Sequence, residues 1–509
     1  MRSIRTALLS TLLGLLLTGP GAFAAQLGHT TFPNSGSEAA QGPFLEGLLL
    51  LHSFEYEDAR TAFQKAQEID PDFAMAYWGE AMTHNKPLWL REDRAAAREI
   101  LERLAPTPEE RLAKAPTERE KAYLQAVELL YGDGEKKERD RRFVDAMGAV
   151  AETFPEDLDA ASFYALYILG TSYDQRDTSI YMRAAAVAEE IFAKNPNHPG
   201  AAHYLIHSYD DPVHAPLGLR PARVYADIAP DAIHALHMPS HIFLALGMWH
   251  ETITSNAASF AASERRRDRL GNERYTHDYH SLSWLHYALL QVGRTDEAKA
   301  KLDMVLDDAA DFPKKKTHSG AAIFWATHVV ETGNLGLPVP DIDTDHLSTN
   351  AFAAFSLAKG LQALGRDDVD GASTILADLR ERLAGDATPE TEQHCATSYA
   401  EVDTTSAEII EAELTALIDL EKGNVDAALA QLEAATLLEG SLPFGVGPPE
   451  PVKPSFELLG EVLLKLGRTD AARERFEQSL ARAPRRARSI AGLAAAGAAP
   501  SVDTDIAAP

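Results

Sequence analysis

Cysteine is almost absent from this chain. Cys395 is the only cysteine among 509 residues. An intramolecular disulfide is therefore impossible, and no cluster of cysteines can bind a metal. The N-terminal segment has no cysteine to carry a lipid, so we do not expect a lipid-anchored lipoprotein. The stability of the fold must come from packing alone.

Basic residues and long apolar segments are also scarce. The chain has 48 Lys and Arg residues against 76 Asp and Glu residues, which gives a formal charge of −28 at pH 7. A surface of this charge repels nucleic acid and anionic membranes and attracts cations. Beyond the N-terminal region, no apolar run is long enough to cross a bilayer. We therefore expect no nucleic-acid partner and no integral membrane segment in the mature chain.

Recognised catalytic motifs are missing as well. His250 and Glu251 begin like the zinc-protease motif HExxH, but Thr254 stands where that motif needs its second histidine. The chain has neither the nucleophile elbow GxSxG nor a phosphate-binding glycine loop followed by Lys and Ser or Thr. The sequence therefore names no reaction.

Residues 1–24 have the features of a secretory signal peptide. Two arginines near the start precede a short apolar run over residues 7–17, and residues 22–24 read Ala-Phe-Ala. Small residues at those places suit cleavage before Ala25. An uncleaved membrane anchor is the alternative, although the apolar run is short for a membrane span. We predict a cleavable signal peptide and a periplasmic or secreted protein.

A pair of helices is predicted near the C-terminus, over residues 456–484. Apolar residues recur there at helical spacing and would fill the seam between the two helices. The small side chains of Gly460 and Ala472 would let the helices approach closely. Gly467 would end the first helix and Pro484 the second.

The same ladder of apolar and small residues recurs through the chain. It appears over residues 40–71, and glycines mark similar turns at Gly247, Gly293 and Gly423. This ladder resembles the tetratricopeptide repeat (TPR), a helix–turn–helix unit of 34 residues. The resemblance covers about half of the chain. It implies an all-α fold, a right-handed superhelical solenoid of paired helices.

These patterns divide the chain into segments. Residues 487–509 are rich in Ala and Pro and show no apolar periodicity, which indicates disorder. We expect a signal peptide over 1–24, N-terminal TPR-like repeats over 40–90, a helical insertion over 91–164, histidine-rich TPR-like repeats over 165–312, helical repeats with a proline-rich joint over 313–400, C-terminal TPR-like repeats over 401–486, and a disordered tail over 487–509.

Histidine is concentrated in one part of the chain. Of 18 histidines, 11 lie between His198 and His286. His203 and His207 form a pair spaced i, i+4, which places both imidazoles on one helix face. His237 and His241 form a second such pair, 34 residues later. Because 34 residues is one repeat length, the two pairs occupy equivalent places on the first helices of adjacent repeats.

The TPR resemblance implies that these histidines face the concave groove. In that family the fifth and ninth positions of the first helix line the groove, and both pairs fall on them. Asp210 would lie at the twelfth position, and His234 and His280 at the second position of their own repeats. Neighbouring packed helices lie about 8–10 Å apart, so imidazoles from two of them can reach one ion.

We therefore hypothesise a transition-metal site formed by His203, His207, His237, His241, Asp210 and His234, with zinc, copper or iron as the metal. Asp210 would be either a ligand or an acceptor that fixes a histidine tautomer. Two alternatives remain open. The histidines could line a polar groove for a peptide or small molecule, or serve only as structural hydrogen-bonding groups.

Weaker candidates lie outside these pairs. Glu80 and His84 are also spaced i, i+4, but at positions that pack between helices, which favours a buried structural pair. His277 and His280 flank Asp278 and could approach the histidine pairs from an insertion between repeats. They are secondary candidates.

Two classes of function follow from the sequence. In one, the groove binds a transition metal, for metal binding or for metal-dependent oxidation or hydrolysis. In the other, the solenoid is a periplasmic protein–protein interaction scaffold that binds a peptide or partner helix. The repetition of histidine at equivalent sites favours the first class. Whether the protein is an enzyme stays open.

Overall fold

The computed structural model describes residues 25–173, 176–271, 277–345, 347–385 and 397–497. The predicted signal peptide over 1–24, Cys395 and the last part of the chain lie outside the described residues.

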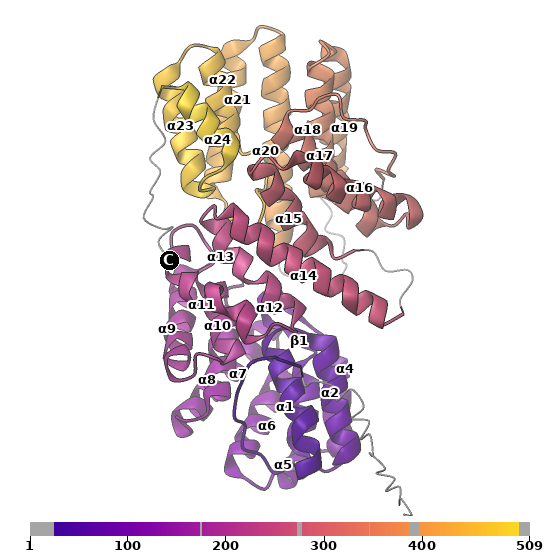
Figure 1. The fold of residues 1–509 in the computed structure, drawn as a ribbon, viewed down its shortest axis with the longest axis vertical. Coiled ribbons are helices and arrows are strands. Elements are labelled where there is room, and N and C mark those ends of the chain that lie inside the picture. The colour runs from indigo at the N-terminus through magenta and orange to yellow at the C-terminus, as the bar shows by residue number, and fades with distance from the viewer. Residues whose placement is uncertain (1–24, 174–175, 272–276, 346, 386–396, 498–509) are drawn as a thin grey trace, which may run out of the picture.

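The described chain is an all-α superhelix of successive antiparallel helices (Figure 1). The N-terminal half contains α1 (Glu38–His52), α2 (Tyr56–Ile69), α3 (Ala74–Met82), α4 (Arg94–Leu104), α5 (Pro108–Lys114), α6 (Glu118–Leu130), α7 (Lys136–Thr153), α8 (Leu158–Leu169), α9 (Thr178–Lys194), α10 (Pro199–Ser208), α11 (Ala215–Ile228), α12 (Ile233–His237) and α13 (Pro239–Ala245). The C-terminal half contains α14 (Trp249–Arg269), α15 (Tyr279–Gln291), α16 (Thr295–Asp311), α17 (Lys315–Thr332), α18 (Thr349–Leu364), α19 (Val369–Gly385), α20 (Thr397–Glu421), α21 (Val425–Ser441), α22 (Ser455–Lys465), α23 (Thr469–Arg482) and α24 (Ala487–Ala495).

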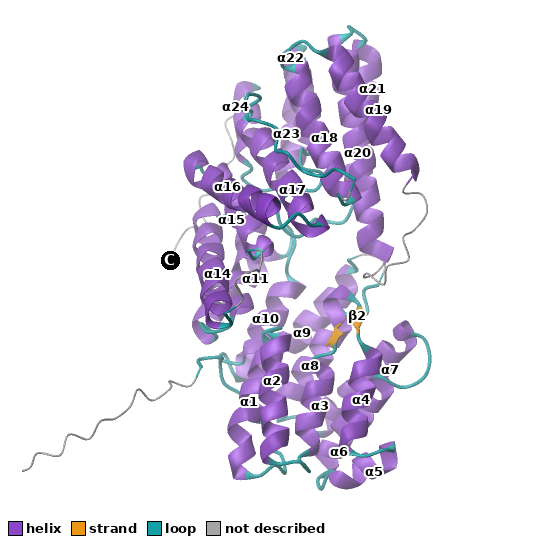
Figure 2. Cartoon of the chain, turned by 90° about the vertical axis from the view of Figure 1, so that its right-hand side faces the viewer, coloured by secondary structure: helices purple, strands orange, loops and turns teal. Residues whose placement is uncertain are grey.

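Extended structure is minimal in the part of the chain that is described. Two strands of two residues each, β1 (Asn85–Lys86) and β2 (Arg91–Glu92), pair antiparallel around the short 3-10 helix η1 (Pro87–Trp89). Figure 2 shows this ribbon beside the helices of the N-terminal half. The expectation of an all-α fold is thus confirmed.

Glycines with positive φ end several helices where the repeat ladder predicted turns. Gly247, Gly293, Gly423 and Gly467 have φ values of +65°, +73°, +80° and +73°. In each case one helix ends two residues before the glycine and the next begins two residues after it. Glycine is favoured there because a Cβ atom is strained at positive φ.

Close helix packing also follows the predicted ladder. A Cβ atom added at Gly460 would lie 2.9 Å from the ring of Phe476, and one added at Gly47 would lie 2.9 Å from the ring of Phe63. Both phenylalanine rings are fully buried. The small residues therefore let paired helices, α1 with α2 and α22 with α23, pack around an aromatic ring.

Two large apolar cores meet near the middle of the chain. The first contains buried residues from Leu27 to Met248, and the second from Ile253 to Val452. The boundary between them falls between α13 and α14. In Figure 1, α14 crosses the molecule between the two halves. The histidine-rich helices lie at this boundary.

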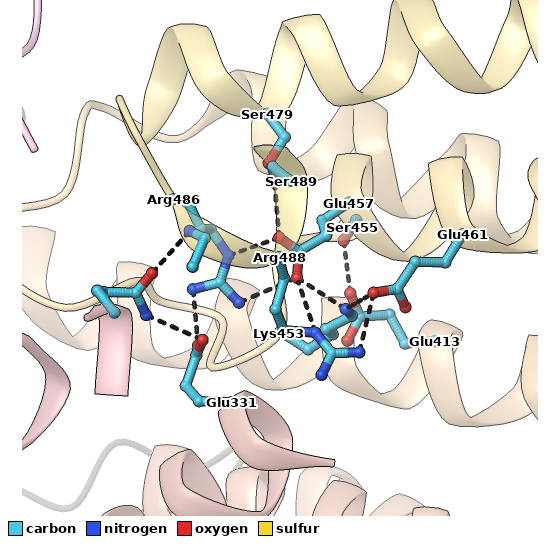
Figure 3. Close-up of polar contacts among 12 residues, drawn as sticks. Glu331, Glu413, Lys453, Ser455, Glu457, Glu461, Ser479, Arg486, Arg488 and Ser489 are labelled. Carbon is cyan, nitrogen blue, oxygen red and sulfur yellow. Dashed lines mark hydrogen bonds and ion pairs between the residues drawn. The ribbon is translucent and has the colours of Figure 1, made fainter. Parts of the chain in front are cut away.

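The prediction of a disordered tail is wrong for residues 487–495, which form α24. Arg486, directly before this helix, has a fully buried side chain. Figure 3 shows its contacts with Glu457 and Glu331. Its guanidinium donates to Glu457 of α22 at 2.7 Å, ion-pairs with Glu331 of α17 at 2.6 Å and donates to the hydroxyl of Tyr287 of α15 at 2.9 Å. Composition suggested disorder because few residues fix this segment: the buried arginine, and Leu493, which packs in an apolar cluster with Phe476.

Among the described residues, no helix is both long enough and apolar enough to cross a membrane.

Candidate metal centre

The first histidine pair lies on α10, near the end of the first core. His198 caps this helix and Pro199 opens it, so both histidines of the pair stand on a regular helical turn. His203 is fully buried and His207 is half-buried. Their ring centroids lie 4.8 Å apart, as the i, i+4 spacing predicts.

The second pair is divided between two short helices. The repeat ladder predicts one continuous first helix from residue 233, but the structure breaks it at Met238 into α12 and α13. Pro239 is the cause, because it has no N–H and its ring clashes with the preceding turn. His237 and His241 nevertheless keep their proximity, with ring centroids 4.9 Å apart.

His203, His207 and His234 form the first triad. The Nε2 atom of His203 lies 3.1 Å from Nε2 of His207 and 3.1 Å from Nε2 of His234. One nitrogen from each residue lies within 4.8 Å of both others. Two residues come from α10 and one from α12, so adjacent repeats build this triad.

His237, His241 and His280 form the second triad. The Nε2 atoms of His237 and His241 lie 3.1 Å apart, and His280 approaches with its ring centroid 4.4 Å from that of His237. Again one nitrogen from each residue lies within 4.8 Å of both others. His280 comes from α15 and is the exposed member of the set.

Three of the six imidazoles are anchored through their other nitrogen. His203 donates from Nδ1 to the carbonyl oxygen of His52 at 2.7 Å, and His241 donates from Nδ1 to the Asp210 carboxylate at 2.6 Å. His237 donates from Nδ1 to the Asn256 side-chain oxygen at 2.7 Å. A proton on Nδ1 leaves a lone pair on Nε2, the atom that points into each triad. Metal-binding histidines commonly have this arrangement.

The spacing of the nitrogens suits a metal ion. Two ligand nitrogens at about 2.0–2.1 Å from a tetrahedral ion lie about 3.3 Å from each other. The observed separations of 3.1 Å are close to that value. Burial also favours the neutral, metal-binding form of the ring: it lowers the pKa of His203 to about 3 and holds the pKa of His237 well below its usual value.

Aromatic side chains enclose both triads. Phe54, in the turn between α1 and α2, has a φ of +57° and places its ring 4.2 Å from that of His203 and 5.5 Å from that of His234. Trp284 of α15 lies against the second triad, with its ring 4.9 Å from His237 and 4.5 Å from His241. These rings hold the imidazoles in place and limit the access of water.

A cavity of about 330 Å³ adjoins both triads. His234 of the first triad lines it, as do His237 and His280 of the second. Its other walls include Phe54 and the Glu55 carboxyl, whose pKa is raised by burial. Most of the remaining lining is charged, so the cavity suits a small polar molecule.

A third buried group contains His52, His198 and Asp159, and its members contact one another. His52 contacts Asp159 through Nε2 at 2.9 Å and the Tyr204 hydroxyl through Nδ1 at 2.9 Å. His198 accepts the N–H of Ala201 at Nδ1 and faces Asp159 with Nε2 at 3.3 Å. Both imidazoles thus face the same buried carboxylate, which makes the group a structural network. Although burial raises it, hydrogen bonds from both histidines hold the pKa of Asp159 below its usual range.

Among the primary candidates, the structure brings together all five histidines. Asp210 stands behind His241 as a hydrogen-bond acceptor and belongs to neither triad. Of the secondary candidates, only His280 reaches the cluster.

The other secondary candidates lie elsewhere. Glu80 is buried, accepts from Gln64 at 2.8 Å and pairs with Arg103, so it is a structural carboxylate. His84 is in none of the histidine triads. His277 contacts Asp308 at 2.8 Å, which turns its Nδ1 away from a metal.

Three groups that contact the site could not be identified from the sequence. Asn256, Phe54 and the backbone carbonyl of His52 come from segments that no motif marks. Only the fold places them behind or beside the triads. A tryptophan one turn after His280 could have drawn attention to Trp284.

A scan of known protein families gives no match. A search of curated proteins gives none either. Solved structures align along most of the chain at low similarity. The structure of the Cut9–Hcn1 APC/C hetero-tetramer has 12% identity, covers 91% of this chain and 78% of that one, and gives a TM-score of 0.34. Yeast Tom70 has 12% identity, coverage of 91% and 96%, and a TM-score of 0.29. The TPR domain of P58(IPK) has 12% identity, coverage of 85% and 99%, and a TM-score of 0.20.

Proposed function

We propose that this chain is a TPR-like solenoid whose histidine cluster binds a transition metal. One observation carries the proposal. Six imidazoles form two triads, and within each triad one nitrogen of every ring lies within 4.8 Å of the others. The Nδ1 atoms of His203, His237 and His241 donate to fixed acceptors. Chance surface histidines would not share both features.

The physical chemistry of the cluster supports this proposal. Burying several imidazoles together costs desolvation energy. His237 and His241 both donate from Nδ1, so their Nε2 lone pairs repel across 3.1 Å. A cation between the nitrogens removes that repulsion and compensates the lost hydration. Neutral imidazole suits zinc, copper, iron or nickel.

Reactivity at such a site would need an open coordination position. A metal with three histidine ligands keeps one position for water or substrate. The charged cavity next to His234 and His280 would supply the entry path. Export of the protein, inferred only from residues 1–24, would place this chemistry outside the cytoplasm.

A protein-interaction scaffold is the second candidate. Helical solenoids offer extended concave surfaces to partners, and the described chain is such a solenoid. The segment from Phe444 to Pro454, however, lies beside Asp210, His241 and Trp249. A peptide entering the groove at this place would compete with the chain itself.

The test is the metal content of untagged protein isolated from its own compartment, measured by mass spectrometry. We compare the wild type with the double variant His203→Ala/His207→Ala. The matched control is His29→Ala/His250→Ala, which removes two exposed histidines outside the triads. We expect stoichiometric metal in the wild type and the control, and a clear loss in the triad variant.

Protein without metal, even after reconstitution with zinc, copper and iron, would refute the proposal. The scaffold would then become the working hypothesis. Capture of a defined partner that the triad variant still binds would support it.

A further inference from the structure

The two triads adjoin each other. The ring centroids of His207 and His241 lie 5.7 Å apart, and those of His234 and His237 lie 6.1 Å apart. These distances between triads are little longer than the 4.8 Å between His203 and His207 within one triad. The six histidines therefore form one continuous cluster with two centres.

Each centre has too few ligands to complete a coordination shell. Three nitrogens leave at least one position open on a four-coordinate ion. The cavity of about 330 Å³ reaches both centres, because His234 of the first triad and His237 and His280 of the second line it. Open positions on the two ions would therefore face a common space.

Charge favours a shared ligand in that space. Neither triad contains a carboxylate or a thiolate, so both ligand sets are neutral. Two divalent ions in adjacent triads would repel each other in a partly buried site. A single anion between them, such as hydroxide from bound water, relieves the repulsion. Sites with two metals about 3.5–4 Å apart commonly share oxygen ligands in this way.

The ligand set restricts the metal to those that neutral imidazole binds well. Imidazole binds copper and zinc well, and the Irving–Williams order gives copper(II) the higher affinity at a nitrogen site. Magnesium, calcium and manganese prefer the oxygen ligands that both triads lack.

We propose that the six histidines form one dinuclear copper centre, in which two copper ions share a bridging oxygen ligand. This inference rests on the proposed function, because it specifies the number, identity and coupling of the bound metals. It predicts that the two ions behave magnetically as a pair.

The test combines copper stoichiometry with electron paramagnetic resonance of the full chain loaded with copper(II). Copper(II) ions that share a bridging oxygen couple their spins, so their signal is largely lost. We expect two copper ions per chain, one for each triad, and a signal that accounts for only a small fraction of the copper.

Single-triad variants provide the internal comparison. His280→Gln removes the exposed ligand of the second triad, and His207→Gln removes a half-buried ligand of the first. Each variant should retain one tightly bound copper and show a signal that accounts for all of it. His250→Ala, at an exposed site outside the cluster, should behave as the wild type. Circular dichroism verifies that each variant is folded.

The outcomes separate the two proposals. Absence of any bound metal would refute the proposed function itself. Two coppers with a full signal, or one copper per chain, would leave metal binding intact and overturn the dinuclear centre. Two zinc ions bound in preference to copper under equal competition would overturn the choice of metal.

Discussion

At the scale of residues, the orientation of each imidazole matters as much as its presence. His203, His237 and His241 each donate from Nδ1 to a fixed acceptor, a backbone carbonyl, an amide oxygen and a carboxylate respectively. The amide of Asn256 is itself oriented, because its nitrogen donates to the carbonyl of Thr252 at 2.9 Å. The lone pairs therefore converge before any metal binds.

Asp210→Asn tests this orientation. The substitution keeps the size of the side chain but removes the charge that supports His241. Loss of an outer-shell partner typically lowers metal affinity by about 10- to 100-fold. We expect weaker binding at the second triad only, measured by competition with a chromophoric chelator. Asp227→Asn, at an exposed carboxylate, is the control. Equal affinities for both variants would contradict the role given to Asp210.

His286 provides a pH test away from the metal cluster. It is buried beside His328, with 3.2 Å between Nε2 of His286 and Nδ1 of His328, and burial lowers its pKa to about 3. The unfolded chain takes up a proton on this residue below about pH 6.5, whereas the folded chain does not. Stability must therefore fall as the pH drops from about 6.5 toward 3, by up to about 1.4 kcal/mol per pH unit.

The expected result is a flatter pH dependence in His286→Gln. Urea unfolding of metal-free protein at about pH 7 and about pH 5 measures it. The free energy of unfolding should fall less in the variant than in the wild type, whatever the variant loses at neutral pH. An unchanged difference between the two pH values would show that His286 is accessible to protons in the fold.

The i, i+4 spacing identified the two histidine pairs in the sequence. The 34-residue repeat placed them on equivalent helices and added His234 as a candidate. The division of the cluster into two triads was beyond sequence reasoning. It depends on where α15 places His280 and on how α14 places Asn256, and both are set by packing between repeats. Asp210 was left open between ligand and acceptor, since a spacing gives no distance.

At the scale of elements, glycine has two different structural roles in the repeats. Gly293 has φ of +73° and ends a helix where a Cβ would meet nothing within 4 Å. Gly460 lies inside α22, where a Cβ would meet the ring of Phe476 at 2.9 Å. Position 293 therefore requires glycine because of its backbone conformation. Position 460 requires it because a larger side chain would not fit.

Gly293→Ala and Gly460→Ala should therefore destabilise by different mechanisms. A side chain at left-handed φ costs roughly 1 kcal/mol, whereas overpacking a buried helix contact costs typically about 1–3 kcal/mol. Equilibrium urea unfolding at matched metal content measures both. In the background of Phe476→Leu, the destabilisation caused by Gly460→Ala should be smaller. The destabilisation caused by Gly293→Ala should be the same as in the wild type. An undiminished effect of Gly460→Ala in that background would contradict the packing role of Gly460.

Sequence patterns predicted these turns because the need for glycine at positive φ arises within the turn itself. The sequence patterns failed where a single residue or a contact with a distant helix decides whether a helix forms. Pro239 splits one expected helix into α12 and α13, and Arg486 orders α24 through carboxylates on other helices. Neither effect alters the apolar periodicity on which the prediction relied.

At the scale of the whole molecule, the second triad joins the two halves. His237 and His241 lie on α12 and α13, beside the first core, whereas His280 lies on α15, whose apolar residues belong to the second core. A metal in this triad would therefore cross-link the two cores. Arg266 of α14 adds a second link through Asp58 of α2, at 3.0 Å.

Metal should consequently stabilise the fold against heat. Ligand present at about 100 times its Kd contributes about 2.7 kcal/mol for one site. We expect calorimetry to show a lower Tm after chelation and a recovered Tm after reloading. In His280→Gln, the shift should shrink by the contribution of the second site. A Tm that does not respond to metal would contradict the cross-link.

Anomalous X-ray diffraction from crystals of the copper-loaded protein shows whether the two triads hold metal. We expect two anomalous peaks at the copper edge, one within about 2.0–2.1 Å of the Nε2 atoms of His203, His207 and His234. The other should lie equally close to the Nε2 atoms of His237 and His241 and to a ring nitrogen of His280. Absence of both peaks, or peaks only at other side chains, would contradict metal binding by the triads.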